Sequence, residues 1–344
     1  MEATAGACDI AAACFRFPDP HRRLAAVRLD CRYLGSPPFS YAPETGTWHL
    51  EVPWPPADRI EYKFELTRRD GTTDWVLDPE EPGRAPGGFG DVSVRRAATY
   101  REPSWLDEPG AAGEWRSHRL AMPVLRSEIT ATVWSPPGAD GRILVAHDGP
   151  DYHRFGELGR FLAASIAAGR VAPCHLVLLP ANDRLEWYSA STAYAKSLTQ
   201  DVLPQLTAVL RAERPVVVGA GVSLGALAML HAQRRHPASF AGLFLQSGSY
   251  FQPRFDSQES GFARWLRIVR FVGRVRRATS GPAVPAGLTC GTVEENLANN
   301  RAMAHFLRLQ GYAVSFAENR DAHAWVGWRD ALDPHLTSLL QRVF

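Results

Sequence analysis

The pentapeptide Gly221-Val222-Ser223-Leu224-Gly225 constrains the fold of this chain more than any other stretch. It separates a short apolar run, Val216–Gly219, from a helical run that begins at Ala226. Between a strand and a helix, G-x-S-x-G predicts a sharp turn that needs both glycines, because a Cβ at either position would collide with its neighbours. Such a turn presents the serine hydroxyl at the end of a sheet, so Ser223 is a candidate nucleophile. The alternative is a serine in an ordinary tight turn, since 28 glycines make a chance match easy.

The length, net charge and cysteine content of the chain limit the kinds of protein that it can be. A chain of 344 residues exceeds what one hydrophobic core usually supports, which predicts two domains. A net charge of +2, from 38 basic and 36 acidic residues, argues against nucleic-acid binding. We expect a cytoplasmic protein without secretory signal, membrane-spanning helix, metal or cofactor, because the first residues carry no positive segment and no apolar run is long enough. The scattered cysteines are expected to be reduced; they are Cys8, Cys14, Cys31, Cys174 and Cys290.

The first part of the chain, residues 12–98, has an all-β pattern. Short segments alternate apolar and polar side chains and are separated by Pro, Gly and Asp turns, which predicts a small β-sandwich of the Ig-like or E-set type. A stretch of low periodicity, residues 99–115, is predicted to be a linker. The predicted strands are Phe15–Phe17, Ala25–Leu29, Thr47–Val52 and Ile60–Leu66.

From residue 116 to residue 344 the pattern alternates strands and helices. The strand-like segments are short and largely apolar, as expected for strands buried on both faces, and the alternation predicts a mostly parallel sheet with helices on both faces. The predicted strands are Ile129–Trp134, Ile143–Ala146, His175–Leu179, Val216–Gly219, Leu243–Gln246 and Leu288–Gly291, and the predicted helices cover 154–168, 193–211, 224–235, 295–310 and 331–343.

A serine nucleophile needs a base to remove its proton and a third group to orient that base. His323 follows the strand-like Tyr312–Glu318 and precedes the last helix, where this type of fold delivers its base. The alternative is that His323 is a surface histidine without a catalytic role. His231, His236 and His335 fall in predicted helices and are poorly placed.

The orienting acid is expected soon after the strand Leu288–Gly291. Glu294 is preferred, because Glu295 is better placed to begin the next helix and Asp321 would have to fold back on His323. All three carboxylates remain open at this point.

Acyl transfer also needs N–H groups aimed at the developing oxyanion. Leu224, directly after the serine, is expected to supply one. The second should come from the loop after Ile143–Ala146, where Pro150 has no N–H, so Gly149 or Asp151 must serve. We take Gly149 as the candidate.

These motifs resemble the enterochelin esterase-like branch of the α/β-hydrolases, which includes siderophore trilactone hydrolases. The resemblance covers most of residues 116–344 and implies Ser223 as nucleophile and His323 as its base. Gly291-x-x-Glu294 matches a family motif, whereas Ala226 and Pro150 depart from the pattern. More loosely, the N-terminal part looks like the first module of cytoplasmic enterochelin esterases. The other matching stretches are His147-Asp148-Gly149, Arg184-Leu185-Glu186, Asp201–Pro204, Gln246–Ser249 and Trp328-Arg329.

Substrate contacts are expected from Arg184, Asp148 and Trp325. Arg184 follows a strand at the edge where ligands bind in open α/β sheets, and its guanidinium can grip a catecholate, carboxylate or phosphate. It can equally form a structural pair with Glu186 or Asp183.

Segment 262–277 has an amphipathic pattern with arginines on one side. It is predicted to be a basic lid over an anionic substrate, a helix resting on an anionic membrane surface, or a core-facing helix with a solvated arginine face. Stable membrane insertion is not expected.

Three functions compete. The leading hypothesis is a serine esterase that cleaves an ester or lactone in a bulky, polar or anionic substrate, such as a trilactone or ferric siderophore. The alternatives are an acyltransferase acting on a sugar or lipid acceptor and a catalytically weak binding protein.

Overall fold

The computed structural model describes residues 12–87 and 90–344 and divides the chain into two compact units. The first comprises the residues up to Arg101 together with Arg320–Ala324, and the second comprises Glu102–Asn319 together with Trp325–Phe344. The stretch predicted to be a linker, 99–115, is therefore divided between the units, and five residues near the end of the chain join the first.

The first unit is all-β, as the alternating pattern predicts. One sheet has the order β1-β4-β3 and the other β2-β5-β8-β7, with β6 paired to β5, and all of these pairs are antiparallel. Aromatic rings from both sheets form its core; Phe15 meets Tyr62 edge-on at 4.8 Å. The strands are β1 (Ala12–Pro18), β2 (Leu24–Asp30), β3 (Ser40–Ala42), β4 (Thr47–Pro53), β5 (Arg59–Arg68), β6 (Thr73–Val76), β7 (Arg84–Ala85) and β8 (Val92–Arg96).

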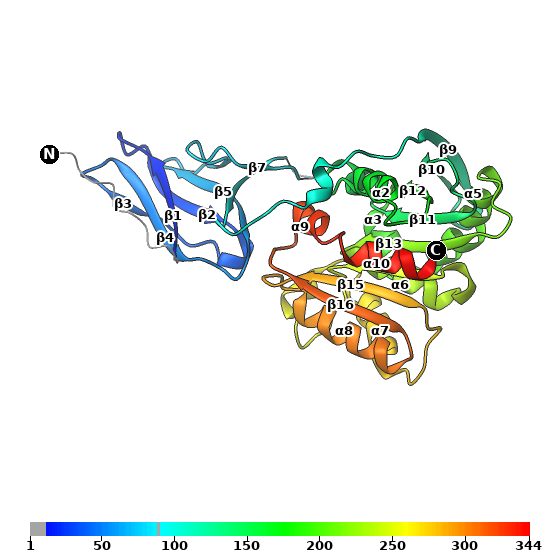
Figure 1. Cartoon of the computed structure of the whole chain (residues 1–344). Coiled ribbons are helices and arrows are strands. Elements are labelled where there is room, and N and C mark those ends of the chain that lie inside the picture. Colours follow the sequence, from blue (N-terminus) through cyan, green and yellow to red (C-terminus); the bar gives the residue numbers. More distant parts are fainter. Residues whose placement is uncertain (1–11, 88–89) are drawn as a thin grey trace. The chain divides into compact units, whose positions relative to one another are not determined.

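The second unit is built on an eight-stranded sheet with the order β16-β15-β14-β13-β11-β12-β10-β9 (Figure 1). The five neighbouring pairs from β16 to β12 are parallel, as predicted for a mostly parallel sheet. The other two pairs are antiparallel, because β10 runs against both β12 and β9. The strands are β9 (Glu114–Met122), β10 (Ser127–Ser135), β11 (Arg142–His147), β12 (His175–Leu179), β13 (Val216–Val222), β14 (Gly242–Gln246), β15 (Pro285–Gly291) and β16 (Ala313–Asn319).

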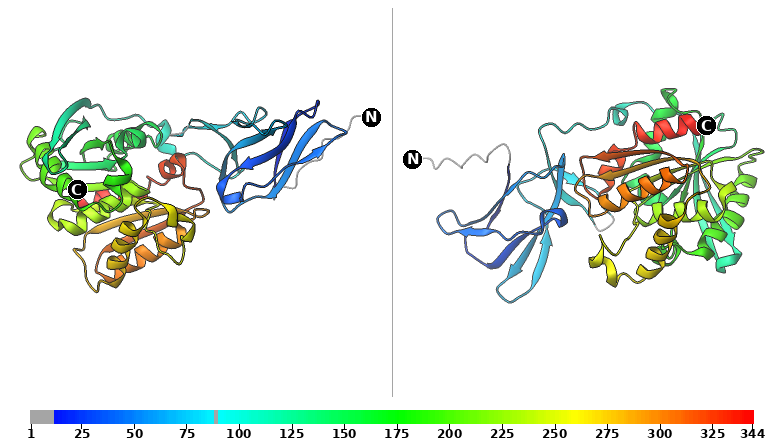
Figure 2. Two further views of the ribbon diagram at one scale, coloured as in Figure 1. Left: turned by 180° about the vertical axis from the view of Figure 1, so that it is seen from behind. Right: turned by 90° about the horizontal axis from the view of Figure 1, so that it is seen from below.

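Helices cover both faces of this sheet, and each face has its own apolar core. Side chains of the central strands alternate between the two cores, which explains why these strands are apolar throughout. In the right-hand view of Figure 2, α10 (red) lies on one side of the sheet and α8 (orange) on the other. The helices are α1 (Gly149–Arg154), α2 (Leu158–Ala167), α3 (Arg184–Tyr188), α4 (Thr192–Ser197), α5 (Leu203–Val209), α6 (Leu224–Arg235), α7 (Trp265–Arg277), α8 (Leu297–Leu309), α9 (Trp325–Asp330) and α10 (His335–Val343), with one π-helical turn, Leu198–Val202, between α4 and α5.

Two helix predictions need correction. The predicted helix 154–168 corresponds to α2, which begins only at Leu158 because Glu157 before it has a φ of 49°, incompatible with a continuous helix; the preceding helix α1 was not predicted. Arg184 was placed on a loop, but it is the first residue of the short helix α3. Asp183 is the N-cap residue of this helix, because its carboxylate accepts the N–H of Glu186 at 3.1 Å.

The cysteines are partly as expected. Cys31, Cys174 and Cys290 are buried thiols, whereas Cys14 is disulfide-bonded, which corrects the expectation for that residue. Cys8 and the first residues of the chain lie outside the described part. Over the described ranges, every helix is too short or too polar to cross a bilayer.

Candidate active site

Ser223 occupies a strained turn between β13 and α6. Its backbone angles, φ 55° and ψ −122°, lie where non-glycine residues are rare. The turn is tight because Gly221 and Gly225 touch: a Cβ on Gly221 would lie 2.5 Å from the carbonyl carbon of Gly225. The Ser223 N–H donates to the carbonyl of Gln246 on β14 at 2.9 Å, which fixes the turn against the neighbouring strand. The sequence pattern thus predicted this geometry correctly.

The hydroxyl of Ser223 meets a second hydroxyl. The Oγ atoms of Ser223 and Ser249 lie 3.2 Å apart, and the Ser249 N–H donates to the Ser223 carbonyl at 3.2 Å. Ser249 is buried and follows β14, the strand next to β13. Sequence reasoning did not single out this residue. The available signal was its position just beyond the end of an adjacent parallel strand.

A second sharp turn follows β11, which pairs with β13 in parallel. Asp148 has a φ of 49°, and α1 begins immediately afterwards at Gly149. A Cβ on Gly149 would lie 2.4 Å from the Cα of Leu178, so this position requires glycine. Pro150, the second residue of α1, leaves the N–H of Gly149 unaffected. Gly149 and Leu224 are therefore the first residues of two helices that start at adjacent strand ends.

His147 ties these two turns together. Its Nδ1 lies 3.0 Å from the carbonyl oxygen of Gly225, which can only accept, so Nδ1–H donates there. Nε2 then accepts from the hydroxyl of Tyr194 at 2.9 Å. Burial lowers the pKa of His147 to about 4, which keeps the ring neutral near pH 7. His147 is thus a structural support of the Ser223 turn.

Arg184 pairs with neither of its expected partners. Its Nε and Nη2 donate to the carboxylate of Asp148 at 2.9 and 2.7 Å. Asp183 is instead the N-cap residue of α3, and Glu186 forms ion pairs with Arg264 and Arg267 at 2.7 and 2.6 Å. The Arg184 side chain is 39% exposed, so the pair lies at the surface of the second turn.

Glu294 is a buried carboxylate with fixed contacts. Its Oε1 accepts the N–H of Gly291 at 2.7 Å and the hydroxyl of Ser247 at 2.6 Å. The Ser247 hydroxyl in turn accepts the indole N–H of Trp328 at 2.8 Å. The neighbouring Glu295 is exposed and precedes α8 by two residues rather than beginning it. Glu294 is therefore the better-ordered of the two glutamates.

Asp321 is engaged elsewhere. It forms a buried ion pair with Arg59 of the first unit, with Nη2 and Oδ2 2.8 Å apart. Burial raises the pKa of Asp321 to about 6, and the charge of Arg59 opposes that shift. His323, two residues further on, is exposed and also belongs to the first unit, whereas Ser223 and Glu294 belong to the second.

Trp325 is the first residue of α9 and is partly buried in an aromatic cluster. Its ring meets Trp328 edge-on at 4.9 Å and lies 5.8 Å from that of Tyr152 on α1. The cluster fixes α9 against the start of α1, just beyond the turn at Asp148.

Segment 262–277 contains the helix α7. Its apolar side chains Ile268, Phe271, Val272 and Val275 are buried in the core, so this face is not available to a membrane. The structure thus supports the core-facing interpretation of the helix. Within residues 12–87 and 90–344, no group of three His, Cys, Asp or Glu side chains could hold a metal ion.

The model of a family described as "Putative esterase" matches residues 123–339, and the chain therefore belongs to this esterase family. Several solved structures match nearly the whole chain, including two enterobactin esterases. Enterobactin esterase from Shigella flexneri, in the presence of enterobactin, is 20% identical with a TM-score of 0.76 over 97% of this chain and 94% of that one. Ferric enterobactin esterase from Salmonella typhimurium is 18% identical with a TM-score of 0.77 over 96% and 94%.

A ferulic acid esterase, 19% identical, matches 67% of this chain and 99% of its own with a TM-score of 0.54. No curated protein matches. The enterobactin esterases share the fold of the whole chain, including its all-β unit, and the resemblance seen in the sequence is confirmed.

Proposed function

We propose that the protein is a serine esterase of the α/β-hydrolase type that cleaves an ester or lactone through an acyl-serine intermediate. The observation that carries this proposal is the backbone of Ser223, held at φ 55° between β13 and α6. Such strain persists only where the surroundings enforce it, and it is characteristic of functional positions. Membership of the esterase family supports the same reaction class.

In this mechanism the imidazole of His323 takes the proton of the Ser223 hydroxyl while the oxygen attacks the ester carbonyl. The protonated His323 then gives its proton to the leaving alkoxide, and the acyl group stays on the serine. Water, deprotonated by the same imidazole, then attacks the carbonyl carbon of the acyl-serine. The bond to the serine oxygen breaks, His323 returns its proton to that oxygen, and the acid is released. The position of His323 after the last parallel strand supports its role as base. Glu294 is proposed to orient it, because Asp321 is already paired with Arg59.

The oxyanion is proposed to be held by the N–H groups of Leu224 and Gly149. Both begin helices at adjacent strand ends, where backbone N–H groups lack partners within their own helix and the helix dipole favours negative charge. Asp148 is a poorer candidate, because its N–H already donates to the hydroxyl of Tyr188 at 3.2 Å.

The substrate is proposed to be bulky and polar or anionic, such as a trilactone or ferric siderophore. Arg184 supports this choice, because its partly exposed guanidinium sits on the Asp148 turn beside the proposed oxyanion donor Gly149. We propose substrate contacts from Arg184, Asp148 and Trp325. The similar solved structure from Shigella flexneri was determined in the presence of enterobactin, which makes a trilactone a natural first substrate to test.

The test uses purified full-length protein with aryl esters, a trilactone siderophore and a fluorophosphonate probe. We expect hydrolysis and probe labelling, both lost in Ser223→Ala and unchanged in Ser257→Ala, which alters an exposed serine of the same unit. Hydrolysis that survives in Ser223→Ala would rule out the mechanism. Absent labelling of the wild type would instead favour a binding protein, and transfer of the acyl group to an added sugar or lipid would favour an acyltransferase.

A further inference from the structure

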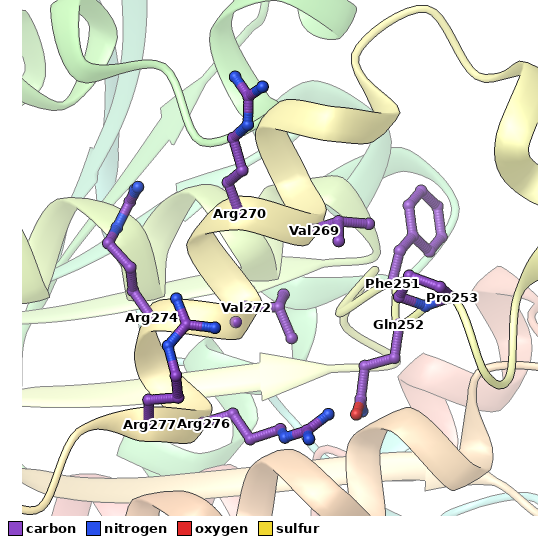
Figure 3. A pocket seen from close by; sticks show the side chains of 10 residues that line it. Phe251, Gln252, Pro253, Val269, Arg270, Val272, Arg274, Arg276 and Arg277 are labelled. Carbon is purple, nitrogen blue, oxygen red and sulfur yellow. The ribbon is translucent and has the colours of Figure 1, made fainter.

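A hollow of about 500 Å³ lies on the surface of α7 (Figure 3). One wall of the hollow is formed by the segment 251–253. The rest of its lining comes from the last three turns of α7. The size is within the range of small-molecule sites. The lining residues are Phe251, Gln252, Pro253, Val269, Arg270, Val272, Gly273, Arg274, Arg276 and Arg277.

Four of the lining residues are arginines that form no ion pair with any described carboxylate. At the start of the helix, Arg264 and Arg267 are paired with Glu186. Over the described ranges of the chain, no ion pair involves the lining arginines, which are Arg270, Arg274, Arg276 and Arg277.

The helix C-terminus favours basic residues in its last turn. It does not account for Arg270, which lies one turn earlier and repels Arg274 at the i,i+4 spacing. The basic field also reaches the neighbouring helix α6: burial chiefly, and then Arg235 and Arg274, lower the pKa of His231 to about 3. A bound anion would relieve this repulsion.

Gly273 shapes the floor of the hollow. Glycine is unfavourable in the middle of a helix, so its presence calls for a local reason. A Cβ at this position would lie 3.3 Å from a guanidinium nitrogen of Arg277, closer than such contacts usually are. Figure 3 shows Arg277 folded back along the helix. The missing side chain therefore lets Arg277 lie across the hollow rather than extend from the end of the helix.

The opposite wall is apolar and rigid. Phe251 is buried and stacks on Trp265 at 5.4 Å with an interplanar angle of 30°, and it also meets Phe262. Pro253 beside it is exposed. The hollow thus combines guanidinium groups, which bind phosphoryl oxygens in pairs, with an apolar surface that suits an organic group.

We propose that the α7 hollow binds a phosphate-bearing small molecule with an aromatic or other apolar part. The phosphoryl group would contact the arginines, and the apolar part would lie against Phe251 and Pro253. This site is independent of ester hydrolysis, because none of its residues belongs to the proposed catalytic set.

Titration calorimetry on the full chain tests the proposal with phenyl phosphate and inorganic phosphate at fixed ionic strength. We expect phenyl phosphate to bind about fivefold more tightly or better, and Arg274→Gln and Arg277→Gln each to weaken it about tenfold. Arg342→Gln, in the last turn of α10, removes one exposed arginine from a matched position and should leave binding unchanged. Gly273→Ala should weaken binding by displacing Arg277.

Three outcomes would overturn the proposal. Equal weakening by Arg342→Gln would show nonspecific attraction, and equal affinity for both phosphates would remove the role of the apolar wall. Binding to phosphatidylglycerol vesicles without binding to phenyl phosphate would make the surface a membrane contact instead. Ser223→Ala should bind phenyl phosphate normally, so a failed esterase assay leaves this test intact.

A second, independent observation concerns the segment that carries His323. Asp58 and Arg59, at the start of β5, hold residues 320 and 321 by main-chain and side-chain contacts. The Asp58 N–H donates to the Arg320 carbonyl at 2.7 Å, and Arg320 Nε donates to Asp58 at 2.8 Å. Arg59, only 2% exposed, donates through Nε to Asp321 at 2.9 Å. Asp321 in turn accepts the N–H of Ala322, the residue before His323, at 2.7 Å.

We infer that Arg59 is a positioning residue for His323, an inference that rests on the proposed function of that histidine. Arg59 would then act by fixing the backbone next to the base. Loss of Arg59 should lower kcat more than it changes KM, because substrate-binding residues are untouched.

The variant Arg59→Met tests this inference, with Arg68→Met as its matched control. Arg68 lies at the other end of β5 and forms an exposed pair with Asp74. We expect kcat to fall about tenfold or more in Arg59→Met, partial recovery in Arg59→Lys, and no change in Arg68→Met.

A milder variant covers the case in which Arg59→Met fails to fold. Arg320→Gln removes only the partly exposed contact with Asp58 and should lower kcat by a smaller factor. Unchanged kcat in well-folded Arg59→Met and Arg320→Gln would overturn the inference. Full activity in His323→Ala would instead show that the proposed function assigns the base wrongly.

Discussion

The turns that follow β11 and β13 use the same backbone device for different purposes. Each leaves a parallel strand through a non-glycine residue with positive φ, 49° at Asp148 and 55° at Ser223, and each leads directly into a helix. Asp148 is held by a charged partner, Arg184, whereas the Ser223 hydroxyl lies 3.2 Å from a neutral group, the hydroxyl of Ser249. The comparison teaches that one strained turn places a side chain in an ion pair, whereas the other places the hydroxyl of the proposed nucleophile beside a neutral group.

The largest expected effect is on the rate of ester hydrolysis, which should differ between variants of the two turns. Ser223→Ala should lower kcat/KM for ester hydrolysis by about 10⁴-fold or more, because the nucleophile is lost. Asp148→Asn, which keeps the size of the side chain in the other turn, should cost far less. Steady-state hydrolysis of an aryl ester measures both. Equal losses would mean that the turns are not functionally distinct.

The next prediction compares how much free energy of unfolding each turn loses when its glycine is replaced by alanine. Gly149→Ala should destabilise the protein by about 3 kcal/mol or more, because its Cβ would overlap the main chain of Leu178. Gly225→Ala should cost less, about 1 kcal/mol, since its Cβ would lie 3.1 Å from the Cβ of His147 and 3.3 Å from a carboxylate oxygen of Asp148, which are tight contacts without overlap of the main chain. Urea unfolding of both variants gives the two free energies. The reverse order would show that the β11 turn is the more adaptable one.

Low pH should lower the free energy of unfolding through His147, the residue that connects the two turns. The folded pKa of His147 is about 4, below its unfolded value of about 6.5, so the unfolded chain binds more protons between these values. The stabilisation is complete above pH 6.5 and is lost as the pH falls toward 4. We expect His147 to account for a loss of about 2 to 3 kcal/mol between pH 7 and 4.5.

Urea unfolding at both pH values measures this loss, with His147→Gln as the comparison. The variant should be less stable at pH 7 but show a smaller change with pH. An identical pH dependence in wild type and variant would contradict the role assigned to His147.

The smallest effect concerns the charged partner of the first turn. Arg184→Gln should destabilise the protein by only about 1 kcal/mol, because the Arg184 side chain is 39% exposed and its pairing with Asp148 is partly screened. If Arg184 also contacts an anionic substrate, KM for a trilactone siderophore should rise while KM for a neutral aryl ester stays the same. Kinetics with both substrates decide this, and an equal change for the two would limit Arg184 to a structural role.

Local patterns were sufficient to predict the strand, turn and helix that carry Ser223. The helix predicted at 224–235 matches α6, because the glycine turn before it and the apolar run within it are both local signals. Strand β9 was not predicted: its first half, Glu114–His118, is largely polar and exposed, since it lies at the edge of the sheet.

Partnerships between distant residues could not be predicted. The pairing of Asp148 with Arg184 depends on the direction in which α3 starts, which the sequence does not specify. The contact between Arg59 and Asp321 joins residues 262 positions apart, and no periodicity carries information over that distance. The roles of Glu294 and His323 stay predictions for the same reason, because they depend on tertiary contacts of the loops that carry them.

The neighbouring strands β11, β13 and β14 all end beside a non-glycine residue with positive φ: Asp148, Ser223 and Ser247. Glycine at any of these positions would relax the chain, since it adopts such angles without steric cost. Selection of variants for heat resistance alone would therefore favour glycine along this edge and remove the hydroxyl of the proposed nucleophile. Thermostable forms of this protein should be sought by selecting for turnover and heat tolerance together.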